Sequence, residues 1–191
     1  MEHVSRPSRR AVARGAAWSV PVISVVAAAP AFAASPCNCP EFYFAGFPAS
    51  GTAGNGWSLT ASSVSPGGGT DQFNGGAFVT VADPPANQAR AVTASRSICV
   101  STGSTYRFTY SWTAYTANPR PMTSVLQING VTIAGSIIDT ATSSTSGTRD
   151  VTWVSNTTGN VNLAFVHTTI SSSASNVGDD ITVRNIAGTC T

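Results

Sequence analysis

The stretch Tyr106-Arg107-Phe108-Thr109-Tyr110-Ser111-Trp112-Thr113-Ala114-Tyr115 decides the fold class, because aromatic and polar side chains alternate along it. In a β-strand, successive side chains point to opposite faces of the sheet. An aromatic stripe at a period of two is typical of a buried face. We therefore expect one set of side chains to lie in a core: Tyr106, Phe108, Tyr110 and Trp112. The alternate set is expected to face solvent: Arg107, Thr109, Ser111, Thr113 and Tyr115.

Shorter apolar alternations lie on both sides of this stretch and are separated by segments rich in Gly, Pro, Ser and Thr. Asn129-Gly130 predicts a tight hairpin, because both positions tolerate a positive φ. The pattern predicts an all-β, two-sheet antiparallel jelly-roll sandwich of about nine strands over residues 57–191. The expected strands cover about 57–63, 77–82, 90–100, 106–115, 123–128, 131–134, 149–154, 161–168 and 180–186.

Residues 1–33 are typical of a cleavable export signal. An uncharged Ala-rich stretch follows the last leader arginine, Arg14, and Ala31-Phe32-Ala33 has the small–x–small pattern of a signal-peptidase site. The pair Arg9-Arg10 resembles the twin-arginine export motif, although Val12 stands where Phe is usual. This favours the twin-arginine route, and the general secretory route stays open. Both routes lead to a secreted or cell-surface protein.

The chain has 191 residues and a net charge of +2, but four of its ten arginines precede Gly15 and no lysine occurs. Residues 34–191 hold six arginines and seven acidic residues, which gives a net charge of −1. That balance does not favour a nucleic-acid partner. No apolar run is long enough for an integral membrane segment. The leader and the absence of lysine indicate a high-GC bacterium.

All four cysteines follow the leader: Cys37, Cys39, Cys99 and Cys190. An even number in an oxidising compartment predicts two disulfides. A bridge within Cys37-Asn38-Cys39 would close a strained ring, so each of these two cysteines is expected to pair with Cys99 or Cys190. Both arrangements tie the Pro/Gly-rich segment 34–56 to a middle strand and to the C-terminus. A four-thiolate metal site is the alternative, but the spacing lacks the paired C-x-x-C of zinc sites.

Several motifs, in this order, resemble those of jelly-roll carbohydrate-binding modules with the galactose-binding-like fold. They extend over about residues 44–187: Phe47 with Gly56-Trp57, Gly103–Trp112, Arg149–Val154, Val161–Phe165 and Gly178–Val183. The resemblance implies a two-sheet sandwich and a sugar ligand. It also implies a structural calcium ion held by Asp179 and Asp180, whose carboxylate oxygens suit this cation. Glu41 is the only acidic residue between the leader and Asp71, and no motif assigns it to that site. The alternative is that the acidic pair only begins a strand.

Strand parity assembles one polar and aromatic group on the outside of the sheets: Arg107, Tyr115, Gln127 and Asn162. Sugar sites combine an aromatic face with polar groups in fixed directions, so these four residues are the predicted ligand-binding set. The alternative is that they are ordinary solvated strand residues.

A catalytic constellation is not visible in the sequence. His167 is the only histidine after the leader and is expected at the rim of a strand, and no G-x-S-x-G or H-E-x-x-H motif occurs. Two carboxylates could still meet across a cleft, so a hydrolase is not excluded. We therefore predict a non-catalytic domain that binds a glycan or cell-wall polymer. The alternative function is a structural or adhesive surface protein without a small ligand.

Overall fold

The computed structural model describes residues 37–63, 69–80, 83–173 and 178–191; the predicted leader lies outside them. A short 3-10 helix, η1 (Cys39–Glu41), precedes two antiparallel sheets. The first, here the six-stranded sheet, runs in the order β1 (Ser50–Gly51), β4 (Gln72–Asn74), β5 (Ala77–Thr80), β13 (Asp180–Cys190), β7 (Thr105–Tyr115) and β11 (Ser146–Val154). The seven-stranded sheet runs β10 (Ile138–Asp139), β8 (Met122–Ile128), β12 (Gly159–Thr169), β6 (Arg90–Val100), β3 (Trp57–Ala61) and β2 (Ala53–Gly54), with β9 (Val131–Thr132) paired to β8.

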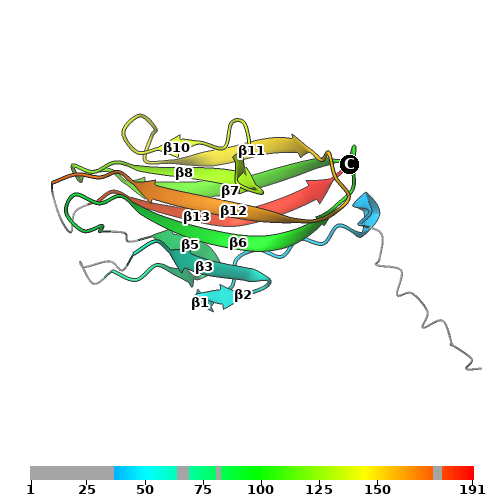
Figure 1. Cartoon of the computed structure of the whole chain (residues 1–191), viewed down its shortest axis with the longest axis horizontal. Helices are drawn as coiled ribbons and strands as arrows, with labels where there is room; N and C mark the ends of the chain where they lie inside the picture. The colour runs from blue at the N-terminus through cyan, green and yellow to red at the C-terminus, as the bar shows by residue number, and fades with distance from the viewer. Residues whose placement is uncertain (1–36, 64–68, 81–82, 174–177) are drawn as a thin grey trace, which may run out of the picture. The chain divides into compact units, whose positions relative to one another are not determined.

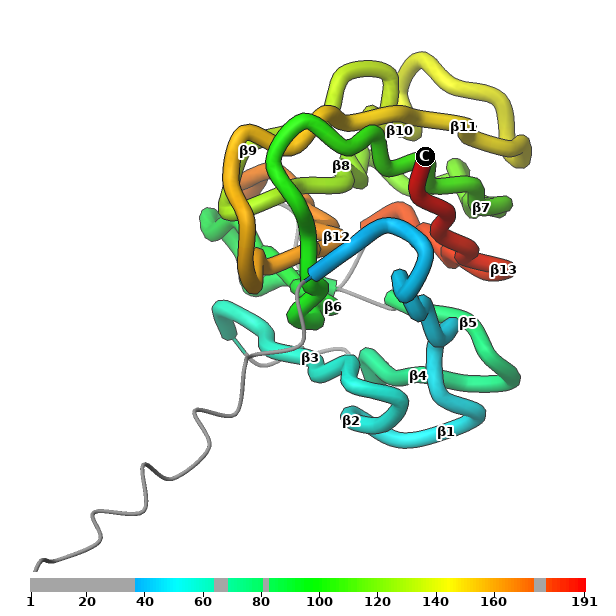
Figure 2. The backbone as a smooth tube through the Cα atoms, turned by 90° about the vertical axis from the view of Figure 1, so that its right-hand side faces the viewer, coloured from blue at the N-terminus to red at the C-terminus, as the bar shows by residue number. Residues whose placement is uncertain are grey.

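The two sheets face each other as a sandwich (Figures 1 and 2). In Figure 2, β7, β13 and β5 follow one another on one side, and β8, β12, β6 and β3 lie on the other. From β5 to β8 and from β10 to β13, consecutive strands belong to different sheets, as in a jelly roll. The predicted two-sheet antiparallel sandwich is therefore confirmed.

The alternation in β7 has the predicted result. Tyr106, Phe108, Tyr110 and Trp112 are all at most 3% exposed and lie in the core. Val161, Leu163 and Phe165 of β12 and Leu126 and Ile128 of β8 are buried with them. Burying large apolar side chains contributes on the order of 1.5–3 kcal/mol each, so this shared interior is the main source of stability.

Segment 42–47, which precedes the first strand, places one phenylalanine in the same core and packs two more against it. Phe42 packs edge-on against Tyr106, with ring centroids 5.0 Å apart. Phe44 contacts Trp57 and Phe108, and Phe47 lies 4.6 Å from the ring of Trp57. Phe47 is therefore a member of the core, and Phe42 and Phe44 are partly buried against it.

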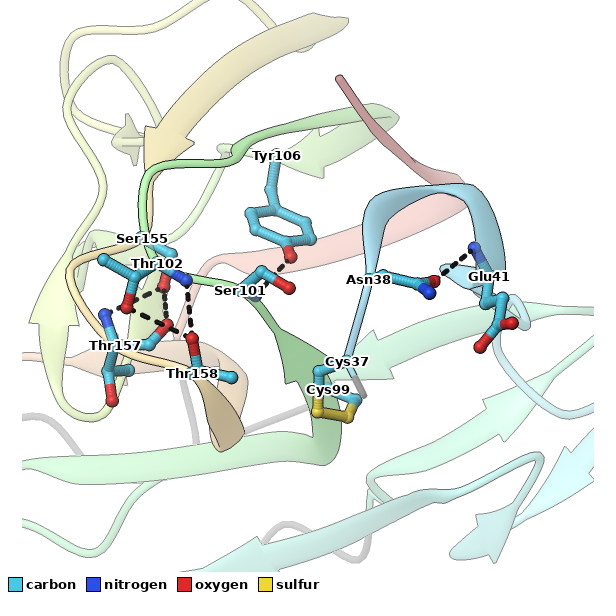
Figure 3. The surroundings of a disulfide bond; sticks show 10 residues. All are labelled: Cys37, Asn38, Glu41, Cys99, Ser101, Thr102, Tyr106, Ser155, Thr157 and Thr158. Carbon is cyan, nitrogen blue, oxygen red and sulfur yellow. Dashed lines mark hydrogen bonds between the residues drawn. A yellow bond between two sulfur atoms is a disulfide. The ribbon is translucent and has the colours of Figure 1, made fainter. Parts of the chain in front are cut away.

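The disulfides are Cys37–Cys99 and Cys39–Cys190. They join Cys37, which precedes η1, to the end of β6, and Cys39, the first residue of η1, to the end of β13. The N-terminal segment is thus tied to a middle strand and to the C-terminus, as predicted, and the structure settles the pairing that the sequence left open. Figure 3 shows the first bridge beside the turn after β6, where the hydroxyl of Tyr106 accepts a hydrogen bond of 2.8 Å from the backbone N–H of Ser101. The sequence separations are 62 and 151 residues, so both bridges close long loops.

The nine predicted strands all have counterparts, but the described residues form thirteen strands. The additional ones are β1, β2, β4 and β10, each of two or three residues. The hairpin turn is as predicted, with φ of 48° at Asn129 and 81° at Gly130. None of the helices among the described residues is long and apolar enough to cross a membrane.

Candidate functional site: a groove on the six-stranded sheet

The structure divides the four predicted ligand residues between two opposite faces. Arg107 and Tyr115 are on the outer face of the six-stranded sheet, eight residues apart along β7 and thus separated by roughly 27 Å. Gln127 and Asn162 are on the outer face of the seven-stranded sheet. Strand parity distinguishes inside from outside, but it does not tell which sheet a strand joins. The four residues therefore do not form one site.

Arg107 already has a partner on its face. Its Nε donates a hydrogen bond of 2.7 Å to Oδ1 of Asp150, and its terminal nitrogen pairs with Oδ2 of the same carboxylate. The hydrogen bond from Arg107 lowers the pKa of Asp150. Both side chains are about half exposed, so water screens this ion pair and it contributes little to stability.

On the opposite face, Gln127 and Asn162 have local contacts. The side-chain amide of Gln127 donates to the hydroxyl of Thr132 at 3.4 Å across the β8–β9 hairpin. The backbone N–H of Asn162 donates to the side-chain oxygen of Asn129 at 2.8 Å. These contacts fix the hairpin, and no hollow described below includes either residue.

Three adjoining hollows lie on the outer face of the six-stranded sheet, with volumes of about 290, 570 and 370 Å³. The first and second share Val79 and Thr182, and the second and third share Asn185. We call this row the outer groove and its parts the Tyr115 hollow, the middle hollow and the Asp150 hollow. The outward-facing residues that line the Tyr115 hollow include Thr113, Tyr115, Asp180 and Thr182. Those of the middle hollow include Asn74, Val79, Arg184 and Asn185, and those of the Asp150 hollow include Thr109, Ser111, Thr148 and Asp150.

A β-bulge in β13 forms the centre of the outer groove. Arg184 is paired with Ser111 and Ala187 with Thr109, so β13 has one residue more than β7 in this interval. Asn185 takes the left-handed conformation, with φ of 55°. As a result Arg184 and Asn185 are both exposed, although neighbours in a regular strand face opposite sides. The bulge thus places two polar side chains next to each other where the middle and Asp150 hollows meet.

Hydrogen bonds hold the bulge against β7. The side-chain amide of Asn185 donates to the hydroxyl of Ser111 at 3.0 Å, and this hydroxyl donates to the backbone carbonyl of Arg184 at 3.3 Å. The guanidinium of Arg184 reaches the hydroxyl of Thr113 at 3.3 Å. The polar groups of the groove centre therefore have defined positions before any ligand binds.

The Tyr115 hollow combines an exposed ring with a carboxylate. Tyr115 is 58% exposed, and Asp180 is its direct partner across β7 and β13. Burial raises the pKa of Asp180 to about 6, and the negative charges of Asp83, Asp179 and Asp71 add to this rise. This end of the groove is therefore acidic and partly desolvated.

The neighbouring carboxylates hold the backbone at this end of the sandwich. Oδ1 of Asp179 accepts from the N–H of Asn118 at 3.0 Å, and Oδ1 of Asp83 accepts from the N–H of Gly178 at 3.2 Å. Asp71 forms a buried ion pair with Arg90, with 2.5 Å between the charged atoms. Asp179 and Asp83 therefore hold the backbone of neighbouring loops in place.

The predicted calcium site remains a prediction. Oδ1 of Asp180 is buried without a hydrogen-bond partner among the described residues, which suits a cation. However, in the described part of the chain no three His, Cys, Asp or Glu side chains are placed to hold a metal together. Glu41 is at the other end of β13, two residues from the Cys39–Cys190 bridge, so it cannot join Asp180. A cation here would need backbone oxygens or water as further ligands.

His167 lies in the core and not at a rim, which corrects the sequence-based expectation. It is fully buried, stacks on Phe78 with ring centroids 4.2 Å apart, and lies 2.6 Å by Nδ1 from the hydroxyl of Thr80. Burial lowers its pKa to about 3, so the ring is neutral at ordinary pH. The histidine joins the two sheets and is not available to a substrate.

Sequence reasoning missed Arg184 and Asn185, although a signal was present. Ile181 and Val183 point into the core, so regular alternation would place an apolar residue at position 185. Asn185 stands there instead, and the next buried apolar residue is Ile186, one position later. Such a one-residue shift in an otherwise regular alternation indicates a bulge. Bulges often re-aim side chains beside functional sites, so the interruption could have directed attention to these residues.

No protein-family model matches the chain, and comparison with curated proteins also gives no match. Among solved structures, the chain is similar to the C-terminal domain of EclA, described as a sugar-binding protein, with 16% identity, a TM-score of 0.43 and coverage of 59% of this chain and 76% of that one. It is also similar to TmCBM61, solved in complex with β-1,4-galactotriose, with 10% identity, a TM-score of 0.35 and coverage of 70% and 88%. These partial likenesses concern the fold, and the function proposed next rests on the outer groove.

Proposed function

We propose that this chain is a secreted, non-catalytic domain that binds a glycan or cell-wall polymer in the outer groove. The observation that carries the proposal is the row of three hollows centred on the bulge at Arg184 and Asn185. A regular outer sheet face has no need of a bulge in an inner strand. Here the bulge adds polar side chains at the point where two hollows join.

The lining of the outer groove suits sugar hydroxyls. Thr113 and Thr182 supply hydroxyls, Asn74 and Asn185 supply amides, and the exposed ring of Tyr115 offers an apolar face to a pyranose. The hollows lie over β4, β5, β13, β7 and β11, which span about 19 Å at the usual strand spacing. An extended polymer fits this shape better than a single small molecule.

Secretion is supported by the two disulfides, since such bridges persist in oxidising compartments. It agrees with the export signal predicted for residues 1–33. A non-catalytic role is supported by the state of the acidic residues beside the groove. Asp71, Asp83, Asp150 and Asp179 each contact a guanidinium or a backbone N–H, as described above. Asp180 lies in the groove with an oxygen that lacks a partner among the described residues, but glycoside cleavage needs two carboxylates across a cleft.

The test is affinity electrophoresis and a glycan array with the exported chain and two variants, Tyr115→Ala and Asn185→Ala. We expect at least one polysaccharide to retard the migration of the exported chain. Each variant should bind that polysaccharide about tenfold or more weakly, which corresponds to a loss of roughly 1.4 kcal/mol of binding free energy. Asn162→Ala is the matched control, because it removes an exposed asparagine from the opposite face. Binding that survives both groove variants, or that Asn162→Ala abolishes, would refute the proposal.

The second candidate is a structural or adhesive surface protein without a small ligand. It is favoured by the outer face of the seven-stranded sheet, where the outward positions of β3, β6, β8 and β12 carry no charged residue. Those positions are Ser58, Thr60, Ala91, Thr93, Ser95, Ser97, Cys99, Thr123, Val125, Gln127, Asn160, Asn162, Ala164, Val166 and Thr168. Attachment to a surface that depends on Thr93 and Val166, and not on Tyr115, would favour this candidate.

A further inference from the structure

The groove is electrically uneven along its length. In the Tyr115 hollow the charged side chain is the carboxylate of Asp180, and in the middle hollow it is the guanidinium of Arg184. The two residues are four positions apart on β13, or roughly 13 Å along the strand. A ligand lying in the groove thus meets a negative charge at one end and a positive charge near the centre.

Arg184 is available to a ligand. Arg184 belongs to neither of the ion pairs described above, Arg90–Asp71 and Arg107–Asp150. Its hydrogen bond to Thr113, at 3.3 Å, uses one of the five N–H donors of the guanidinium. The lining of the middle hollow contains no carboxylate.

The bulge explains why this arginine stands in the groove beside a second donor. Asn185 is exposed next to Arg184 because β13 carries one additional residue there. Asn74 lies on the other wall of the same hollow. A planar guanidinium binds a carboxylate through two parallel hydrogen bonds, and the flanking amides can bind the hydroxyls of the same sugar ring.

We propose that the middle hollow binds the carboxylate of a uronic acid through Arg184, so that the ligand of the outer groove is an acidic glycan. This inference rests on the proposed function and names its ligand class. The negative end at Asp180 favours a neutral sugar beside Tyr115. The matching polymer therefore carries uronic acids among neutral sugars and not at every position.

The experiment compares hyaluronan and glucuronoxylan, each with its carboxyl-reduced form, by affinity electrophoresis of the exported chain. We expect at least one acidic polymer to be bound about tenfold or more tightly than its reduced form, in line with a charge-assisted pair. The preference should decrease as salt is added, because the pair is exposed. Arg184→Gln should remove the preference, and Arg184→Lys should keep part of it.

Asn162→Ala is the control, since it removes an exposed polar side chain from the opposite sheet face, outside the three hollows, and leaves the charges of the groove unchanged. Circular dichroism should show that each variant is folded. Equal binding of acidic and reduced polymers, or a preference that Arg184→Gln retains, would overturn the uronate inference and leave glycan binding intact. If neither these polymers nor any glycan on the array is bound, the proposed function fails together with the inference.

Discussion

The imidazole of His167 and the hydroxyl of Thr80 lie 2.6 Å apart inside the sandwich and connect its two sheets. His167 belongs to β12 and Thr80 to β5, and both are fully buried. Nε2 of His167 is buried without a hydrogen-bond partner among the described residues. A protonated ring would therefore place an uncompensated charge in the core, which is the physical reason for its lowered pKa.

This contact predicts that the chain loses stability in mild acid. The pKa of His167 is about 3 in the folded chain and about 6.5 in an unfolded one. Above the higher value both states are neutral and stability is complete. As the pH falls from about 6.5 toward 3, only the unfolded state takes up the proton, so the free energy of unfolding decreases by about 1.4 kcal/mol per pH unit from this group.

Chemical denaturation at a series of pH values measures this effect. His167→Gln should flatten the dependence between pH 6.5 and 3, and the carboxylates then account for what remains. Because the substitution changes the core, Thr80→Val provides a second measurement. It should cost about 1–3 kcal/mol through the loss of the hydrogen-bond partner and leave the pH slope in place. An unchanged slope in His167→Gln would show that His167 does not govern acid stability.

The two disulfides predict a large loss of stability on removal. In a chain-entropy treatment, closing loops of 62 and 151 residues contributes about 4 and about 5 kcal/mol. We expect Cys37→Ala with Cys99→Ala, and Cys39→Ala with Cys190→Ala, each to lower the free energy of unfolding by about 2–5 kcal/mol. Denaturation curves of the oxidised chain and the two double variants give the comparison. A loss below about 1 kcal/mol for both pairs would contradict it.

The calcium prediction can be tested by thermal unfolding. If calcium binds the folded chain at Asp180, the Tm should be higher in excess calcium than in the presence of a chelator. At a hundredfold excess over Kd, calcium should add about 2.7 kcal/mol to the free energy of unfolding. Asp180→Asn should remove the rise, because it replaces the charged carboxylate, whose Oδ1 is buried without a hydrogen-bond partner among the described residues, by a neutral amide. Asp150→Asn, on the same sheet face but paired with Arg107, should keep it. A Tm that calcium does not change would rule the site out.

The long strands could be predicted because each repeats the same alternation several times. β6 was expected at its observed bounds, and β7 within one residue. The strands β1, β2, β4 and β10 have two or three residues, which is too short for a period of two to be visible. They form because neighbouring backbone groups are already in place, and that tertiary cause leaves no pattern in the sequence.

The candidate site was less predictable for two physical reasons. Alternation places Tyr115 and Gln127 outward but does not assign β7 and β8 to different sheets, so residues from opposite faces were grouped together. The groove centre depends on a bulge, in which one additional residue in a strand interrupts the same alternation. The interrupted alternation after Val183 indicates a bulge, and the paired registers of β13 and β7 then show that Arg184 and Asn185 face the same side.

Gly188 should be intolerant of any side chain, since it is the point at which Phe44 approaches β13. A Cβ at this position would lie 2.9 Å from two carbons of the Phe44 ring and 3.3 Å from the ring of Phe42. The ring of Phe44 cannot move aside easily, because Trp57 and Phe108 pack against it. The guanidinium of Arg96 also lies 4.7 Å from the Phe44 ring centroid.

We therefore expect Gly188→Ala to lower the free energy of unfolding by about 1–3 kcal/mol through overpacking. Gly46→Ala is the matched control: a Cβ there meets only the carbonyl of Ile186 at 3.6 Å, an ordinary contact. Urea denaturation of both variants measures the difference, which reflects whether segment 42–47 is packed as tightly as the sheets. Equal stability of the two alanine variants would contradict this prediction. It would show that Phe44 can shift and that segment 42–47 packs more loosely than the sheets.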